Sequence, residues 1–377
     1  MNSLNIGGLE VRLPIIQGGM GVGISLSGLA SAVANEGGIG VISSVGVGMN
    51  ESNYANNFRD SNRIGLIKEI RKARTKTKGI LGVNIMLALT DFDEILKISV
   101  DEKIDVVFMG AGLPLKIPSS ILQQNDENTK TKFVPKVSSA RAAKLIFQYW
   151  SNKYQRIPDA VVVEGPKAGG HLGFKKKDLN DPKFNIFNLI KETIPEIDKF
   201  EQQYGIEIPV IAAGGIYTGK DIYEIMQAGA KGVKMGTRFV TTNECDAAMS
   251  FKKNYLSCKK EEDIAIIDSP VGLPGRVIRN NFVNQILNGA KKPIKCPWKC
   301  IKTCNYKEAP FCIALALINS AKGHFSEGFS FAGTNAYLAD KIQTVKETFS
   351  ELILEYDSLT YMKTIEKSLQ FSNKSVA

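Results

Sequence analysis

The chain of 377 residues has no run of about 18 consecutive apolar residues, the length that a membrane-spanning helix requires. Its N-terminus also lacks the basic stretch and the apolar core of a secretory signal peptide. These two absences predict a cytoplasmic protein that does not associate with a membrane.

Acidic residues are outnumbered by basic ones, 38 against 48, which gives a formal net charge of +10. The lysines and arginines are scattered, and no nucleic-acid recognition motif accompanies them, so a nucleic-acid partner is not expected. A lysine-rich solvated surface accounts for the charge. The alternative is attraction of an anionic ligand or an acidic carrier protein.

The chain has six cysteines, which in a cytoplasmic protein of this size predict reduced thiols rather than disulfides. Cys296, Cys300 and Cys304 recur every four residues and Cys312 follows, a spacing that predicts one face of a helix. Zinc and iron–sulfur sites favour two-residue gaps on turns, so a packing stripe is the favoured interpretation and no metal ligand is assigned. A metal or cluster site and a redox-active thiol stay open.

Eight apolar, mostly β-branched stretches alternate with segments that are mostly long enough for a helix. This alternation predicts an α/β protein with a parallel sheet and right-handed crossovers. Eight such units within about 240 residues match a (β/α)8 TIM barrel. Glycines and polar residues follow many of the strands, whereas a doubly wound open sheet would concentrate its site at one switch point. The strands are expected at residues 13–16, 39–42, 80–86, 105–109, 133–137, 160–163, 209–213 and 232–235.

The pattern changes after the eighth strand. Residues 1–244 are expected to form the barrel, and residues 245–325 a smaller, mainly helical, Cys- and Lys-rich subdomain over its C-terminal face. Residues 326–377 are expected to return to the barrel through a helix at 335–355. Within the subdomain, the prolines and glycines of residues 263–278 predict an irregular segment that could cover the site.

Two of the predicted strands end in glycine pairs. Residues 160–163 run into a Gly-Gly-His sequence at 169–171, and residues 209–213 run into Gly-Gly at 214–215. Glycines at such points let backbone N–H groups approach a phosphate, because no Cβ blocks the way. His171 is one of 2 histidines in the chain. The combination predicts a cofactor cradle with one titratable group beside it.

Five motifs, in order along residues 10–245, together resemble the nitronate monooxygenase (2-nitropropane dioxygenase) family, which includes the flavin-dependent enoyl-acyl-carrier-protein reductases. The motifs are QGGMG at 17–21, GVNIM at 82–86, EG through AGGHLG at 164–173, AAGGI at 212–216 and GTRF at 236–239. The resemblance implies an FMN-binding TIM barrel with a small domain over the flavin.

The resemblance also implies which residues bind FMN. Gly19 and Met20 would lie against the flavin ring, and Asn84 would hydrogen-bond to it. The loops after the seventh and eighth strands would hold the phosphate, a frequent arrangement in such barrels. The expected FMN-binding residues are Gly18, Gly19, Met20, Asn84, Lys136, Glu164, Gly169, Gly170, Ala213, Gly214, Gly215, Met235, Gly236 and Thr237.

His171 matches the histidine that the family's monooxygenases use near the flavin, and it is the expected catalytic base. The first hypothesis is therefore an FMN-dependent oxidoreductase that oxidises an alkyl nitronate or a related small carbanionic substrate. In the alternative, NAD(P)H reduces FMN, which then reduces an enoyl thioester on an acyl carrier protein. Leu172 and the basic surface favour that alternative. A barrel that binds a phosphorylated ligand without redox chemistry is the third hypothesis. The sequence leaves a homodimer open.

Overall fold

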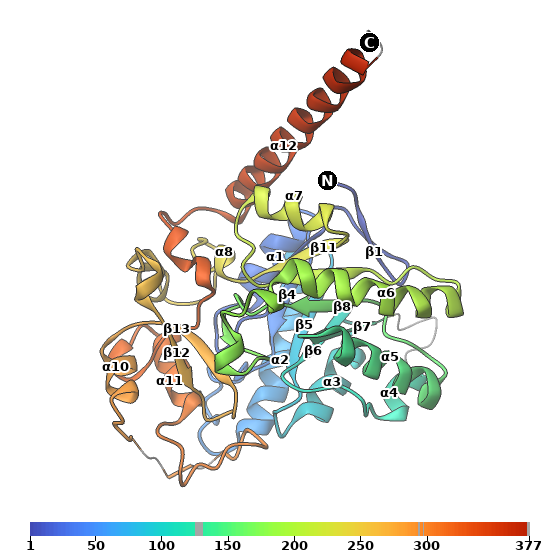
Figure 1. Ribbon diagram of the computed structural model, residues 1–377. Coiled ribbons are helices and arrows are strands. Elements are labelled where there is room, and N and C mark those ends of the chain that lie inside the picture. The colour runs from blue at the N-terminus through green and yellow to red at the C-terminus, as the bar shows by residue number, and fades with distance from the viewer. Residues whose placement is uncertain (125–130, 293–294, 297, 375–377) are drawn as a thin grey trace.

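The computed structural model describes residues 1–124, 131–292, 295–296 and 298–374. A nearly closed barrel of eight parallel strands forms its centre (Figure 1). The strands pair in the order β3-β11-β10-β8-β7-β6-β5-β4, and a bridge between Ile16 and Ile39 joins the two ends. The predicted TIM barrel is confirmed, and each strand overlaps its predicted range. The strands are β3 (Ile15–Gln17), β4 (Gly40–Ser43), β5 (Leu81–Met86), β6 (Val106–Gly110), β7 (Lys132–Val137), β8 (Val161–Glu164), β10 (Val210–Ala213) and β11 (Gly232–Met235).

Helices surround the barrel, and side-chain caps fix where several of them begin. The amide N–H of Asp60 donates to the side chain of Asn57, which caps the helix that begins at residue 58. Thr218 and Asp221 form a capping box at the start of another helix. The helices are α1 (Ser27–Asn35), α2 (Phe58–Lys76), α3 (Phe92–Asp101), α4 (Ser119–Gln124), α5 (Ala140–Tyr154), α6 (Ile186–Tyr204), α7 (Gly219–Gln227) and α8 (Thr237–Val240).

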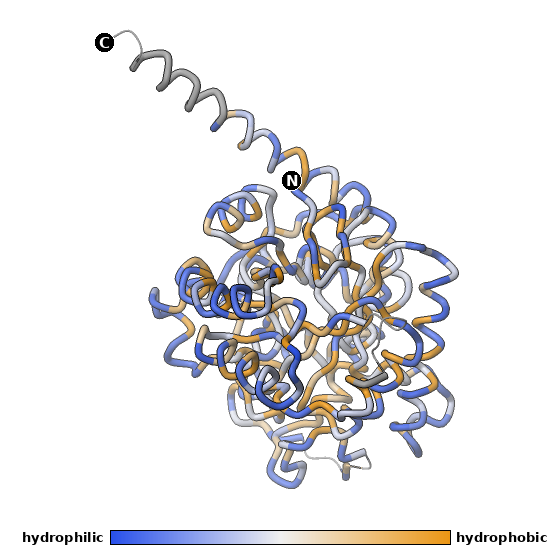
Figure 2. The backbone as a smooth tube through the Cα atoms, turned by 90° about the vertical axis from the view of Figure 1, so that its right-hand side faces the viewer, coloured by the Kyte–Doolittle hydropathy of each residue, from blue (hydrophilic) through white to orange (hydrophobic). Residues whose placement is uncertain are grey.

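An antiparallel hairpin of β1 (Leu4–Ile6) and β2 (Leu9–Val11) belongs to the core inside the barrel. Its buried side chains pack with inward-facing strand residues such as Phe108 and Val162. The sequence pattern did not predict this hairpin, because three-residue strands are too short to show a clear period. Figure 2 shows that hydrophobic residues are concentrated in the interior and that the outer helices carry many hydrophilic residues. The barrel interior is therefore a packed core rather than a channel, and a ligand must bind at its mouth.

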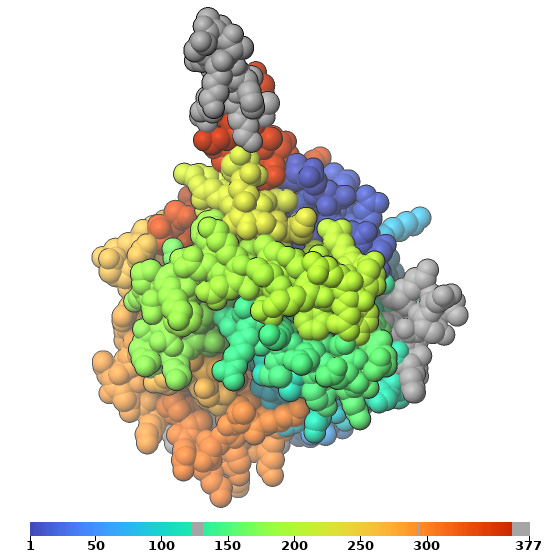
Figure 3. All heavy atoms as spheres, turned by 45° about the vertical axis from the view of Figure 1, so that its right-hand side comes forward, coloured from blue at the N-terminus to red at the C-terminus, as the bar shows by residue number. Residues whose placement is uncertain are grey.

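A second hydrophobic cluster lies over the carboxyl ends of the strands. We call residues 264–331 the lid, and Figure 3 shows much of it, in orange, at the end of the molecule opposite helix α12. Helix α9 (Met249–Leu256) precedes it. The lid contains strands β12 (Ile264–Asp268) and β13 (Pro274–Ile278) and helices α10 (Asn281–Leu287) and α11 (Ile313–Ala321). Strand β9 (Gly170–His171) pairs with β13, so the lid is joined directly to the loop after β8.

Two predictions for this region are wrong. Residues 263–278 are not irregular but include the β12–β13 hairpin, whose turn contains Gly272 at a φ of +87°. The expected cysteine helix does not form among the described residues between α10 and α11. Lys299, between Cys296 and Cys300, has a φ of +48°, a left-handed conformation that a right-handed helix does not contain. The domain boundaries at 244 and 325 stay a prediction.

The C-terminal helix α12 (Val345–Lys374) begins ten residues later than expected. It packs on the barrel through two aromatic contacts, Phe349 on Phe239 at 5.8 Å and Tyr356 on Tyr223 at 5.5 Å between ring centroids. Its far end projects away from the barrel (Figure 1). Over the described residues, no helix is long and apolar enough to cross a membrane.

Candidate active site

A cavity of about 480 Å³ opens at the carboxyl ends of the barrel strands, beneath the lid. This volume lies within the range of about 300–1,000 Å³ that is typical of small-molecule sites. Every residue that the sequence assigned to the site lines this cavity. Gly18, Gly19 and Met20 follow β3; Asn84 lies on β5, Lys136 on β7 and Glu164 on β8; Gly169, Gly170 and His171 form the loop into β9; Ala213, Gly214 and Gly215 end β10; and Met235, Gly236 and Thr237 end β11.

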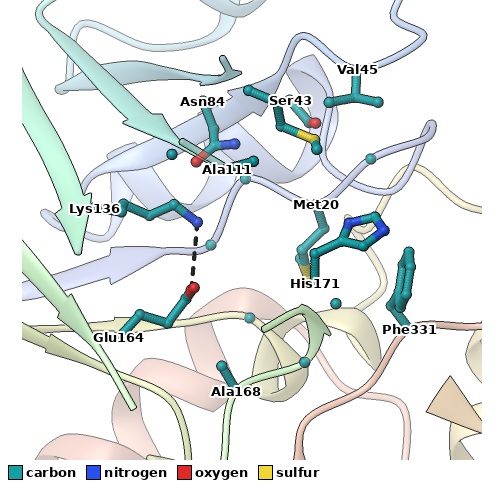
Figure 4. Close-up of a pocket in the computed structure, with 18 of the residues that line it drawn as sticks. Met20, Ser43, Val45, Asn84, Ala111, Lys136, Glu164, Ala168, His171 and Phe331 are labelled. Carbon is teal, nitrogen blue, oxygen red and sulfur yellow. Dashed lines mark hydrogen bonds and ion pairs between the residues drawn. The ribbon is translucent and has the colours of Figure 1, made fainter. Parts of the chain in front are cut away.

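Two lysines bring positive charge to the floor of the cavity. Lys136 Nζ lies 3.4 Å from Glu164 Oε1, an ion pair drawn in Figure 4. Lys234 lies deeper, with its Nζ 3.8 Å from the centroid of the Phe108 ring. Burial, and then the charge of Lys136, lower the pKa of Lys234 well below its usual value. Burial therefore disfavours the charged form of Lys234, whereas Lys136 has an ion-pair partner.

Three buried polar atoms of the cavity wall have no hydrogen-bond partner within the described part of the chain. They are Ser43 Oγ, Asn84 Oδ1 and Lys234 Nζ. A buried polar group left without a partner costs about 1–3 kcal/mol, so such groups normally meet a ligand or water. A polar ligand in the cavity would satisfy them. They fit the polar edge of a flavin, which offers both hydrogen-bond donors and acceptors.

Glycines allow the backbone to come close to the cavity. A Cβ at Gly19 would lie 2.3 Å from the Cβ of Asn84, so no larger residue fits there. Gly214 and Gly215 have φ angles of +92° and +79°, a region that other residues rarely adopt. A Cβ at Gly214 would also lie 2.9 Å from the carbonyl oxygen of Gly165. The loops after β8 and β10 therefore form a close backbone cradle of the kind that holds a phosphate.

His171 faces the cavity from strand β9 (Figure 4). Its Nε2 lies 2.7 Å from the hydroxyl of Ser269 in the lid, and its ring packs edge-on against Phe331 at 4.9 Å. Burial, and then the charge of Lys136, lower the pKa of His171 to about 4. The imidazole is therefore neutral at pH 7, the form that can accept a proton.

Arg276 holds the loop that carries His171. Its Nη1 donates to the carbonyl oxygens of Pro166 and Ala168, at 2.5 and 2.6 Å, from a position opposite Gly170 in the β9–β13 pairing. Sequence reasoning missed this role, as it missed the contacts of Ser269 and Phe331, because they depend on lid pairing that no local pattern encodes. Lys234 could have been found, because a lysine within the apolar run GVKM interrupts a buried strand.

We expect Lys234→Met to separate protein stability from ligand binding. In the ligand-free protein, the substitution removes a buried amine without a hydrogen-bond partner and should raise the free energy of unfolding by about 1–2 kcal/mol. It should also weaken about tenfold the binding of FMN, the ligand that the sequence resemblance implies, because one hydrogen-bond donor is lost. Urea unfolding and FMN fluorescence titration measure the two effects.

The matched control is Lys136→Met, which leaves Glu164 without its ion-pair partner and should lower the free energy of unfolding. A decrease in the stability of Lys234→Met equal to that of the control would contradict the view that Lys234 is kept for a ligand.

Comparisons with known proteins identify the family. The sequence profile of the family described as Nitronate monooxygenase matches residues 2–355. A "Probable nitronate monooxygenase" of Staphylococcus saprophyticus is 26% identical over 74% of this chain and 79% of its own length. The structure of FabK from Thermotoga maritima is similar with a TM-score of 0.70 and 27% identity, covering 96% of both chains.

A third relative carries a different name. The (3aS,4S,5R,7aS)-5-hydroxy-7a-methyl-1-oxo-octahydro-1H-indene-4-carboxyl-CoA dehydrogenase of Rhodococcus jostii is 27% identical over 73% of this chain. The match spans 65% of that relative's length. Because the family profile covers most of the sequence, the chain belongs to the nitronate monooxygenase family of oxidoreductases.

Proposed function

We propose that the protein is an FMN-dependent oxidoreductase that oxidises alkyl nitronates or a related small carbanionic substrate. The observation that carries the proposal is a neutral histidine facing a cavity in whose wall Ser43 Oγ, Asn84 Oδ1 and Lys234 Nζ find no hydrogen-bond partner among the described residues. FMN, when bound, would supply the electron acceptor. Asn84, Lys136 and Lys234 would bind the polar edge of the flavin, and the backbone at 214–215 and 236–237 would hold its phosphate.

His171 would move the proton in this chemistry. When the substrate is presented as the neutral nitroalkane and the Nε2–H of His171 donates to Ser269, the lone pair of Nδ1 would accept the proton from the carbon beside the nitro group, which leaves the nitronate to be oxidised. Ser269 would then fix the imidazole tautomer. The positive charge of Lys136, which already lowers the pKa of His171, would attract the nitronate anion that this deprotonation produces.

One feature of the cavity favours the alternative, reduction of an enoyl thioester with electrons from NAD(P)H. The lid side of the cavity is apolar and would suit an acyl chain, and its lining includes Val271, Leu273, Leu317, Phe329 and Phe331. The names of two relatives point in different directions here, since one is a probable nitronate monooxygenase and the other a carboxyl-CoA dehydrogenase. An acyl carrier protein as partner belongs to this alternative.

An absorption spectrum followed by anaerobic titration tests the proposal. The purified protein should show a flavin band, and an alkyl nitronate should bleach it while NADH and NADPH do not. Bleaching by a nicotinamide nucleotide, with reoxidation by an enoyl thioester, would transfer the assignment to the reductase. The absence of a flavin band, also after addition of FMN, would overturn both.

The depressed pKa of His171 predicts an unusual pH profile. Because the neutral imidazole is the active form, kcat/KM for a neutral nitroalkane should be level from about pH 5.5 to 8 and fall as the pH drops through about 4. An ordinary histidine would place this decline near pH 6.5. The measurement is stopped-flow kinetics after pH jumps from neutral solution.

The pH jumps are necessary because protonation of His171 also lowers the free energy of unfolding in acid. The unfolded chain binds a proton at His171 near pH 6.5 and the folded chain near pH 4, so the free energy of unfolding should fall across that interval as the pH decreases. A decline in rate centred at pH 6.5 would contradict the assignment of a buried neutral base.

A further inference from the structure

A second cavity, of about 280 Å³, contains four of the six cysteines in its wall. Cys296, Cys300 and Cys304 line it from the irregular segment between α10 and α11. Cys312, the residue just before α11, lines it from the other end of that segment. None of the four forms a disulfide. The four cysteines that were predicted to lie on one face of a helix instead line one cavity.

The second cavity adjoins the candidate active site. Cys300, Ile301 and Ile313 line both cavities. Backbone contacts fix the shared wall to the barrel: Ile301 forms a bridge with Leu89, and the N–H of Thr90 donates to the carbonyl oxygen of Cys300 at 3.1 Å. A group bound among the cysteines would therefore lie next to the pocket that we assign to FMN.

The arrangement of the thiols distinguishes between kinds of metal site. Among the described residues, no three His, Cys, Asp or Glu side chains converge closely enough to hold a single metal ion. A zinc ion, with Zn–S bonds of about 2.3 Å, would draw four sulfurs to within about 4 Å of one another. A [4Fe–4S] cluster instead takes one cysteine at each of four irons, so its ligands surround a volume. We propose that Cys296, Cys300, Cys304 and Cys312 bind an iron–sulfur cluster of the [4Fe–4S] class in this cavity.

Backbone donors already point at two of these sulfurs. The N–H of Lys299 donates to Cys296 Sγ at 3.4 Å. The N–H groups of Ala314 and Leu315, in the first turn of α11, hydrogen-bond to Cys312. Such donors and the positive end of a helix stabilise the thiolate charge that a cluster ligand carries. Lys299 itself also lines the cavity and adds positive charge against an anionic cluster.

The test is the metal content of the full chain, purified and reconstituted with ferrous iron and sulfide without oxygen. We expect about four iron and four acid-labile sulfide per chain, with an electron paramagnetic resonance signal after reduction by dithionite. Cys300→Ser and Cys312→Ser should lower the iron and sulfide content at least about tenfold. The matched control is Cys258→Ser, because Cys258 is buried away from both cavities and should leave the content unchanged.

Iron and sulfide near zero in the reconstituted wild-type chain would overturn the proposal, as would one zinc per chain without sulfide. Equal loss in Cys258→Ser would also overturn it, because the cavity cysteines would then have no special role. FMN released by denaturation is measured on the same samples. Failure of the cluster with FMN present, or of FMN with the cluster present, therefore separates this inference from the proposed function.

Discussion

The His171→Asn variant is expected to lose about a hundredfold to ten-thousandfold in kcat/KM for a neutral nitroalkane, from which a proton must be removed, the range that a positioned general base contributes. Asparagine can keep a hydrogen bond to Ser269 but cannot accept a proton from carbon at neutral pH. Because the backbone at 214–215 and 236–237, which would hold the phosphate, does not include His171, FMN content should stay unchanged. Steady-state kinetics and the flavin spectrum of the same samples measure both quantities.

The chain provides its own control in its second histidine. His324 is exposed and does not line the cavity, so His324→Asn should leave the rate unchanged. Ser269→Ala, which removes the group that would fix the tautomer, should have an intermediate effect and leave FMN content unchanged. A His171→Asn enzyme with the wild-type rate would show that the substrate reacts without a base, and it would move the assignment toward the reductase.

The barrel and the composition of its mouth could be predicted from the sequence because both depend on local patterns. Apolar runs of four to six residues followed by glycine mark a buried parallel strand and its loop, and the barrel brings all such loops to one end. This is why Asn84, Lys136 and Gly214, far apart in the chain, were assigned together and line one cavity.

The lid could not be predicted in the same way. Its sheet joins β9 to β13, strands separated by about a hundred residues, and nothing within residues 263–278 indicates that partner. The regular spacing of Cys296, Cys300 and Cys304 favoured a helix, but the backbone at Lys299 adopts a positive φ of 48°, which the cysteine spacing does not reveal. The lowered pKa of Lys234 also could not be predicted. It depends on burial by residues from other strands, such as Phe108, and a periodic pattern does not reveal these contacts.

Gly214→Ala is expected to abolish tight FMN binding, by a factor of about a hundred or more. The substitution has two costs. A positive φ of +92° disfavours alanine by about 1–2 kcal/mol. The new Cβ would also lie 2.9 Å from the oxygen of Gly165 and 3.0 Å from the nitrogen of Ala168, so the loops after β8 and β10 must separate. Moving the cradle by even a few tenths of an ångström lengthens every hydrogen bond to a phosphate held by backbone N–H groups.

The variant Gly8→Ala measures the backbone strain of alanine at a positive φ without the steric contact. Gly8 has a similar φ of +87° in the β1–β2 turn, but a Cβ there would meet nothing within 4 Å. Both variants should therefore lose a comparable amount of stability from backbone strain, while FMN affinity should fall in Gly214→Ala alone. Equal FMN affinity in the two variants, measured by fluorescence titration, would show that the 214–215 loop does not hold the phosphate. The cradle would then have to be sought at 236–237, where a Cβ on Gly236 would meet only the Met20 side chain, at 3.4 Å and beyond.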